Sequence, residues 1–287
     1  MALALKGIAD SRFVMTEHSS QILNTNYLPS WVKNLAPRIY RNYDKVIGVS
    51  PFLVEKMNKN FNANAVYIPN MYDDKTFFGR GRKKKNENSS FMFVFVGNLI
   101  KSKNPILCIE AFCKAFADSN FMTPNGGKII LSIVGDGPEL RTCEATIDRL
   151  NMRRNVRLLG VLQRTQISEI MQDSKCFVLP SQYETFGVVY IEAMACGLPV
   201  IATRCGGPDS FINESNGRLI PVDDETALVS AFKHMLENAE YYDSVKIAQT
   251  TAALFSPNSV ARAMIKLYKN LSFQQPKNLA PSKGKGQ

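Results

Sequence analysis

Residues 176–203, CFVLPSQYETFGVVYIEAMACGLPVIAT, constrain the fold of this chain more than any other stretch. They begin with a short apolar run typical of a buried strand and pass through a polar turn into a helical pattern at 188–196. Gly197 stops that helix, and the apolar residues 198–202 predict the next strand. This strand–loop–helix–strand order indicates a parallel α/β sheet, in which ligands bind at the carboxyl ends of the strands.

Two carboxylates frame the start of the predicted helix. Glu184 lies at the strand exit, and Glu192 follows eight positions later. Between them, the free N–H groups of residues 187–189 form a natural seat for phosphate. Two carboxylates beside an anion site suit a nucleotide sugar, which carries hydroxyls on both sides of a diphosphate. The alternative makes Glu192 a solvated helix residue, although it lies in the apolar run VVYIEAMA, where an unpaired carboxylate is costly.

The Glu-x7-Glu spacing inside ETFGVVYIEAMACGLPVIAT resembles the signature of the family 4 retaining glycosyltransferases. The resemblance extends from about Arg12 to Leu271. It implies an α/β protein of GT-B type, with a complete C-terminal Rossmann-like domain and a partial N-terminal one. It also implies a hexosyltransferase of polysaccharide biosynthesis. Such an enzyme moves a hexose from a UDP- or GDP-linked donor to a glycan or lipid-linked acceptor, with retention of anomeric configuration.

The resemblance also assigns roles to individual residues. Glu184 would contact the donor sugar hydroxyls, and His18, in a loop after the strand RFVMT, would face the sugar across a cleft; these are the catalytic candidates. The second carboxylate would hold the ribose, and the helix-start amides would hold the sugar and diphosphate. The donor-binding candidates are Glu192, Lys103, Asn98, Gly97, Phe186, Gly187, Val188, Val189 and Gly135.

The loop after the apolar strand 91–96 carries the cation expected to meet the diphosphate. Lys103 can reach a phosphate as a point charge, and the alternative is an exposed loop lysine. In the family an arginine stands five residues before this lysine, whereas this chain has Asn98. One diphosphate contact is therefore weakened or supplied by another group.

Other cofactor classes are disfavoured by the motifs. Residues 135–137 read GDG, which matches the family's VGDGP loop but lacks the GxGxxG of nicotinamide-dependent oxidoreductases. No Asp-x-Asp sequence and no His/Cys cluster occurs, so we expect no metal and no other required cofactor.

The net charge of +10 is unevenly distributed, and its densest cluster is RGRKKK at 80–85. Two interpretations stay open: a solvated linker, or peripheral attraction to an anionic membrane surface that carries a lipid-linked acceptor. Nucleic-acid binding would require basic residues interleaved with aromatic ones, so we expect no nucleic-acid partner. Six cysteines without a CxxC pair indicate a reduced, cytoplasmic protein, with the inner face of the membrane as the alternative location. No apolar run approaches the roughly 20 residues of a membrane span.

The organisation expected along the chain has five parts. They are a partial, acceptor-side N-terminal domain at 1–79, a basic linker at 80–90, a nucleotide-sugar-binding domain at 91–255, a helix at 256–271 that packs back on the N-terminal part, and a disordered tail at 272–287. The resemblance implies a truncated N-terminal domain, because few residues precede the His18 strand. The second functional hypothesis is therefore a catalytically inactive or truncated sugar-nucleotide-binding module.

Overall fold

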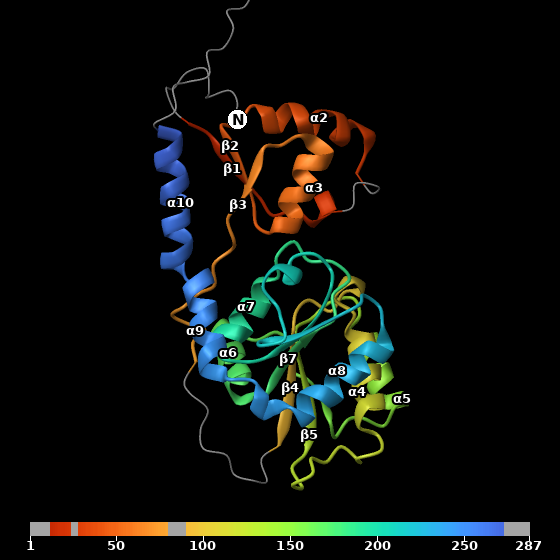
Figure 1. The fold of residues 1–287 in the computed structure, drawn as a ribbon. Coiled ribbons are helices and arrows are strands. Elements are labelled where there is room, and N and C mark those ends of the chain that lie inside the picture. The colour runs from red at the N-terminus through yellow and green to blue at the C-terminus, as the bar shows by residue number, and fades with distance from the viewer. Residues whose placement is uncertain (1–11, 24–27, 80–89, 273–287) are drawn as a thin grey trace, which may run out of the picture.

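Two parallel β-sheets organise the protein, one above the other in Figure 1. The structure is a computed structural model that describes residues 12–23, 28–79 and 90–272. In that part of the chain the smaller sheet has the order β1-β2-β3 and the larger has the order β6-β5-β4-β7-β8-β9. All the strand pairs within the two sheets are parallel. The α/β fold expected from the sequence is confirmed.

The larger sheet contains the strands that the apolar runs predicted. Its strands are β4 (Phe91–Val96), β5 (Ile129–Val134), β6 (Val156–Leu158), β7 (Cys176–Leu179), β8 (Val200–Thr203) and β9 (Gly217–Ile220). β4 pairs with β5 on one side and with β7 on the other, so the direction in which strands are added reverses there. In open parallel sheets this switch point opens a crevice at the carboxyl ends of the strands, where ligands bind.

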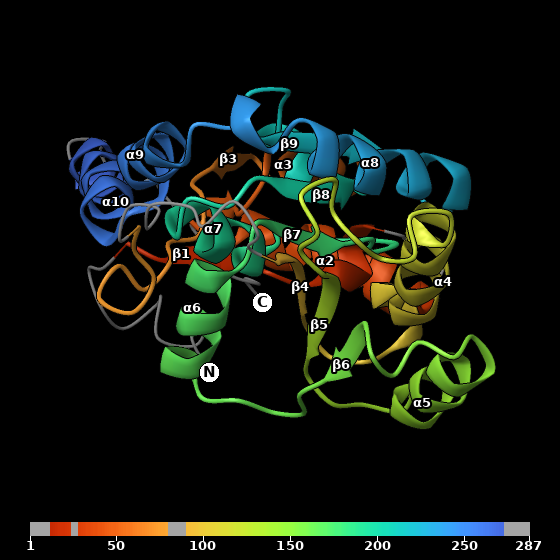
Figure 2. The same ribbon diagram turned by 90° about the horizontal axis from the view of Figure 1, so that it is seen from below.

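Helices cover both faces of the larger sheet. Figure 2 shows α4 (Pro105–Phe116), α5 (Leu140–Arg149) and α8 (Glu225–Glu237) on one side, with α6 (Arg164–Asp173) and α7 (Val188–Ala195) on the other. α9 (Ser244–Phe255) packs against α7. Phe93 of β4 anchors the first layer, with its ring centroid 5.0 Å from that of Phe232 and 5.8 Å from that of Phe116. Because aromatic burial contributes strongly to stability, this layer fixes the strands that carry the loops above them.

The smaller sheet consists of β1 (Val14–Glu17), β2 (Lys45–Gly48) and β3 (Ala65–Tyr67), accompanied by α2 (Ser30–Arg41) and α3 (Pro51–Phe61). The final helix, α10 (Pro257–Ser272), returns to this sheet and lies beside it in Figure 1. Val260 of α10 packs with Ile47 and Ile68 in a buried apolar cluster that Met264 and Leu267 extend. The two ends of the described chain therefore share one core.

The structure differs from the sequence expectations in several elements. α2 was not predicted; it contains Pro37, a residue that normally ends a helix. The strand expected at 198–202 begins two residues later and ends one residue later, at 200–203, because Pro199 lacks the N–H that a central strand must donate. α10 extends to Ser272, the first residue of the expected tail. The rest of that tail and the cluster at 80–85 lie outside the described residues. Among the described helices, none is long and apolar enough to cross a membrane.

Candidate functional site

Two loops meet at the switch point of the larger sheet and bring a cation against a carboxylate. The loop after β4 ends in the 3-10 helix η3 (Lys101–Lys103), and the loop after β7 carries Glu184. Lys103 Nζ lies 2.5 Å from Glu184 Oε1, and both side chains are largely buried. Ser181 Oγ donates to the same carboxylate oxygen at 3.0 Å. Residues 81 positions apart in sequence are thus joined where a parallel sheet binds its ligands.

Hydrogen bonds to backbone carbonyls hold these two loops in place. The amide of Gln182 donates to the carbonyl of Ser102 at 2.8 Å. The Asn104 side-chain amide donates to the carbonyl of Pro180 at 3.1 Å, and the Thr203 hydroxyl donates to the carbonyl of Ser181. These bonds satisfy carbonyls of the β7 exit and hold the segment that leads to Glu184 in a defined position.

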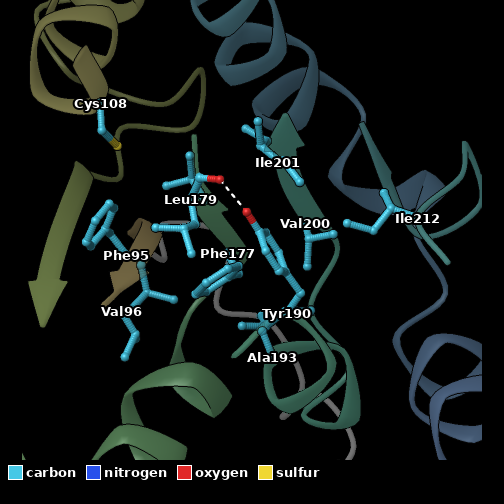
Figure 3. Close-up of a cluster of buried hydrophobic side chains, with 14 of the residues drawn as sticks. Phe95, Val96, Cys108, Phe177, Leu179, Tyr190, Ala193, Val200, Ile201 and Ile212 are labelled. Atoms are coloured by element: carbon cyan, nitrogen blue, oxygen red, sulfur yellow. Dashed lines mark hydrogen bonds between the residues drawn. The ribbon is translucent and has the colours of Figure 1, made fainter. Parts of the chain in front are cut away.

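The helix α7 begins beside this pair with free N–H groups. Gly187 precedes it with φ of 89°, and no side chain caps the helix start. A Cβ on Gly187 would lie 2.5 Å from the ring of Tyr190, so glycine is required both for the conformation and for the space. The Tyr190 hydroxyl donates to the carbonyl of Leu179 at 2.6 Å, which ties the helix to β7 (Figure 3). The backbone N–H groups of Val188 and Val189 are therefore uncapped and held in a fixed position, as at the helix N-termini that bind anions in other proteins.

Phe186 and Gly207 support the backbone of the Glu184 loop. The Phe186 ring is fully buried, with centroids 5.2 Å from Phe211 and 5.6 Å from Phe255. Only its backbone can therefore face a ligand. Gly207 donates its N–H to the carbonyl of Glu184 at 2.9 Å, and a Cβ there would lie 2.5 Å from the Phe186 Cα. This close approach explains the glycine at position 207.

Glu192 is buried and paired with an arginine that the sequence analysis did not identify. Glu192 is 6% exposed, and its Oε1 lies 2.7 Å from a guanidinium nitrogen of Arg164 at the start of α6. Burial raises the pKa of Glu192, and the hydrogen bond and charge of Arg164 oppose that rise. Arg164 also lies 4.0 Å from Asp73 and stacks over the Phe77 ring. The alternative of a solvated Glu192 is therefore wrong.

Gly97, Asn98 and Gly135 lie where the loops after β4 and β5 touch. Gly135 has φ of 140°, and a Cβ on it would fall 1.9 Å from the carbonyl oxygen of Gly97. The amide of Leu99 donates to the carbonyl of Asp136 at 2.9 Å, which joins the two loops. Asn98 is exposed, and its side chain makes no hydrogen bond to the described residues.

His18 projects from the exit of β1, in the smaller sheet. Its imidazole is exposed and forms no hydrogen bond with the larger sheet's loops in the described part of the chain. The buried carboxylate of Glu17 organises this exit, because it accepts the N–H groups of His18 at 3.0 Å and Ser19 at 2.8 Å and the Tyr40 hydroxyl at 3.1 Å. Burial, followed by the charge of Glu17, raises the pKa of Tyr40.

A cavity of about 770 Å³ separates the two sheets next to the Glu184 loop. Its walls include Leu23, Phe52 and Glu55 from the smaller unit, and Tyr183, Arg204 and Gly206 from the larger. Glu184 and Lys103 are not among its walls, so the cavity adjoins the charged pair and does not enclose it. A Cβ on Gly206 would lie 2.5 Å from the Phe52 ring, so this glycine lets the two units approach.

Sequence reasoning missed three contributors to this region: Arg164, Glu17 and Gly206 as an inter-unit contact. A charged residue at a helix start and one at a strand end are common, so no local signal marks the first two. Within the described residues, no three His, Cys, Asp or Glu side chains gather as metal ligands.

These features define an α/β protein whose sheet switch point brings together an uncapped helix start, a lysine and a carboxylate. The chain belongs to the family of group 1 glycosyl transferases, which matches residues 78–251. It is 30% identical over 241 residues to the N-acetyl-alpha-D-glucosaminyl L-malate synthase of Bacillus anthracis, covering 80% of this chain and 60% of that protein. It is 25% identical over 280 residues to the phosphatidylinositol N-acetylglucosaminyltransferase GPI3 subunit of Saccharomyces cerevisiae, covering 91% and 58%.

The fold also matches solved structures. The crystal structure of Anabaena HepE in complex with UDP superposes with a TM-score of 0.80 at 19% identity, covering 94% of this chain and 75% of that one. The GT-B type of fold that the sequence implied is thereby confirmed. The chain spans less than two thirds of the length of the two relatives named above.

Proposed function

We propose that this chain transfers a hexose from a nucleotide diphosphate sugar to a glycan or lipid-linked acceptor, with retention of anomeric configuration. The observation that carries the proposal is the Lys103–Glu184 pair at the switch point, beside the uncapped start of α7. A lysine and a row of free N–H groups complement a diphosphate, and a carboxylate accepts hydrogen bonds from sugar hydroxyls.

The chemistry follows from where charge develops. The bond between the anomeric carbon and the diphosphate oxygen breaks, the acceptor hydroxyl bonds to that carbon, and its proton leaves with the diphosphate. Negative charge grows on the departing oxygen, and fixed donors aimed at such a charge lower the barrier. Lys103 and the amides of Val188 and Val189 take this role in the proposal. Because an ammonium carries three donors, Lys103 can keep its bond to Glu184 while it binds phosphate.

The remaining donor contacts follow from the geometry of α7. Glu192, one turn beyond the helix start, holds the ribose hydroxyls, and Arg164 opposes the rise in the pKa of Glu192 that burial causes. UDP is favoured over GDP as the nucleotide, because the structurally similar HepE was crystallised with UDP. His18 faces the sugar from the smaller sheet. The cavity between the units takes the acceptor, since its walls come from both units and adjoin the Glu184 loop.

The first experiment tests the charged pair. Calorimetric titration with UDP and GDP, together with transfer assays using their sugars, is carried out on the full chain and on Lys103→Ala and Glu184→Gln. Lys103→Ala should weaken diphosphate binding on the order of tenfold or more, because a charge-assisted contact is lost. Glu184→Gln should retain nucleotide binding and lose transfer. Unchanged nucleotide affinity in Lys103→Ala would remove the proposed site.

The second candidate is a sugar-nucleotide-binding module without turnover, and the short amide of Asn98 favours it. An asparagine supplies no positive charge to the departing diphosphate, in a loop where family members carry an arginine. Donor binding without transfer or donor hydrolysis, in the presence of lipid and glycan extracts, would select this candidate. Anomeric proton couplings of any product decide between retention and inversion.

A further inference from the structure

The helix α2 presents an outward face that combines apolar and basic side chains. Trp31 is 67% exposed and Leu35 is 42% exposed. Arg38 and Arg41 are exposed as well. The spacing of four, three and three residues places these side chains on one side of the helix, while Tyr40, on the opposite side, is 4% exposed and packed in the core. We call Trp31, Leu35, Arg38 and Arg41 the α2 face.

Charge on this helix is entirely positive. The sequence SWVKNLAPRIYR holds three basic residues and no acidic one. Within the described residues neither arginine of the α2 face forms an ion pair; Arg41 only donates its Nε to the carbonyl of Pro37, in its own helix, at 3.1 Å. Of the acids nearest to these arginines in sequence, Asp44 pairs with Arg12, and Glu55 lies on α3 in the wall of the cavity between the units.

We propose that the α2 face docks on the surface of an anionic lipid membrane. Tryptophan favours the level of the lipid headgroups, where its ring is buried and its N–H stays hydrated. Arginines beside it are attracted to a surface of uniformly negative charge. A protein partner would instead be matched by charges of both signs at the rim of the contact.

The place of α2 in the fold connects this surface with the cavity between the units. The 3-10 helix η1 (Ser20–Leu23) lines that cavity through Leu23, and Trp31 follows eight residues later at the first turn of α2. In Figure 1, α2 forms the outer edge of the smaller unit, on the side away from the larger sheet. Membrane docking would therefore keep the smaller unit at the bilayer and leave the larger unit in water.

The protein carries its own probe, since Trp31 is its only tryptophan. The full chain is titrated with vesicles of phosphatidylcholine alone and with vesicles that also contain phosphatidylglycerol. Trp31 emission should shift to shorter wavelength, and the protein should sediment with the vesicles, only when phosphatidylglycerol is present. Raising the salt concentration should release it, because salt screens exposed charges.

Variants separate the α2 face from general basicity. Arg38→Gln combined with Arg41→Gln should lower the vesicle partition coefficient about thirtyfold, from the contribution of each basic residue near an anionic surface. Lys233→Gln combined with Lys246→Gln removes two exposed lysines from the larger unit and should leave partitioning unchanged. Trp31→Ala should weaken sedimentation and, with no other tryptophan present, abolish the emission.

Three results would overturn the proposal. The first is binding that does not depend on phosphatidylglycerol, and the second is an equal loss in the two double variants. The third is a dimer in analytical ultracentrifugation that the α2-face variant converts to a monomer without any vesicle binding, since the face would then join two copies. None of these outcomes depends on nucleotide binding, so the membrane-docking proposal and the proposed transfer activity are tested independently.

Discussion

At the scale of the residue, Arg164 provides the positive charge that pairs with the buried carboxylate of Glu192. Glu192 lies in an apolar helix, and its raised pKa reflects burial first, with Arg164 lowering it and the charge of Asp73 raising it. A carboxylate with a raised pKa binds its proton more tightly in the folded state, so stability falls as pH rises between the unfolded and folded pKa values. The guanidinium limits that loss near neutral pH.

Arg164→Ala should therefore destabilise the protein most near neutral pH. The loss of one charge-assisted hydrogen bond is worth about 1–2 kcal/mol, discounted for the solvent exposure of Arg164. The pKa of Glu192 should rise further, so the destabilisation should shrink as pH falls towards the ordinary range of a carboxyl group. Thermal unfolding and UDP affinity are measured between acidic and neutral pH.

Two variants serve as controls for this prediction. Arg164→Lys keeps the charge and should recover part of the stability. Arg153→Ala removes an exposed pair with Asp148 and should change stability by less than about 0.5 kcal/mol. A loss in Arg164→Ala that is independent of pH would show that Arg164 acts through packing on Phe77 and not through Glu192.

At the scale of the element, the start of α7 depends on one backbone conformation. Gly187→Ala should disturb this turn, because φ is positive and the new Cβ would meet the Tyr190 ring. We expect a destabilisation of about 1–3 kcal/mol together with loss of UDP binding. The matched control is Gly126→Ala, at a φ of 80° with no atom within 4 Å of the new Cβ.

The control separates conformational strain from the geometry of the site. Gly126→Ala should cost about 1 kcal/mol through its positive φ alone and leave UDP affinity unchanged. Calorimetric titration beside thermal unfolding measures both quantities. Equal UDP affinity in Gly187→Ala and the parent would mean that the helix start does not touch the nucleotide.

At the scale of the whole molecule, α10 joins the two units. It leaves α9 at Ser256 and places Val260, Met264 and Leu267 on the smaller sheet. In the described part of the chain the smaller sheet has three strands, and α10 covers the face on which Ile47 and Ile68 lie. Any motion that opens the cavity between the units therefore has α10 as a tether.

Leu267→Ser should loosen this tether. We expect a loss of about 1–2 kcal/mol from the half-buried side chain and faster amide hydrogen exchange in β1, β2 and β3, with the larger sheet unaffected. Ile265→Ser, on the same helix but 51% exposed, should change stability by less than about 0.5 kcal/mol. Uniform acceleration of exchange in both sheets would show that the two units unfold as one.

The α2 face belongs to the same scale. No local sequence pattern marks these four side chains as a surface. Because proline normally ends a helix, Pro37 also argued against predicting α2. The burial of Tyr40, which packs against Phe61 with ring centroids 5.9 Å apart and donates its hydroxyl to Glu17, decides which side of α2 faces outward. The α2 face can therefore be identified only from the tertiary structure, which shows which side of the helix is buried.

The sequence alone determined the elements with strong local signals. Short, largely apolar runs such as FMFVFV and IILSIV predict buried strands, and Gly197 after VVYIEAMA ends a helix, because backbone hydrogen bonding and apolar burial act over a few residues. The position of Glu184 at a strand exit followed from the same rules. So did the parallel sheet, since helices alternate with strands.

Tertiary structure decided the contacts between distant segments. Lys103 meets Glu184 only because β7 is placed next to β4, and Arg164 meets Glu192 only because α6 packs beside α7. Such pairs depend on the sum of many weak contacts across the core, which no local pattern encodes. Local sequence patterns therefore predict which residues lie at the edge of the sheet, whereas the packing of the whole chain determines which of them form ion pairs with one another.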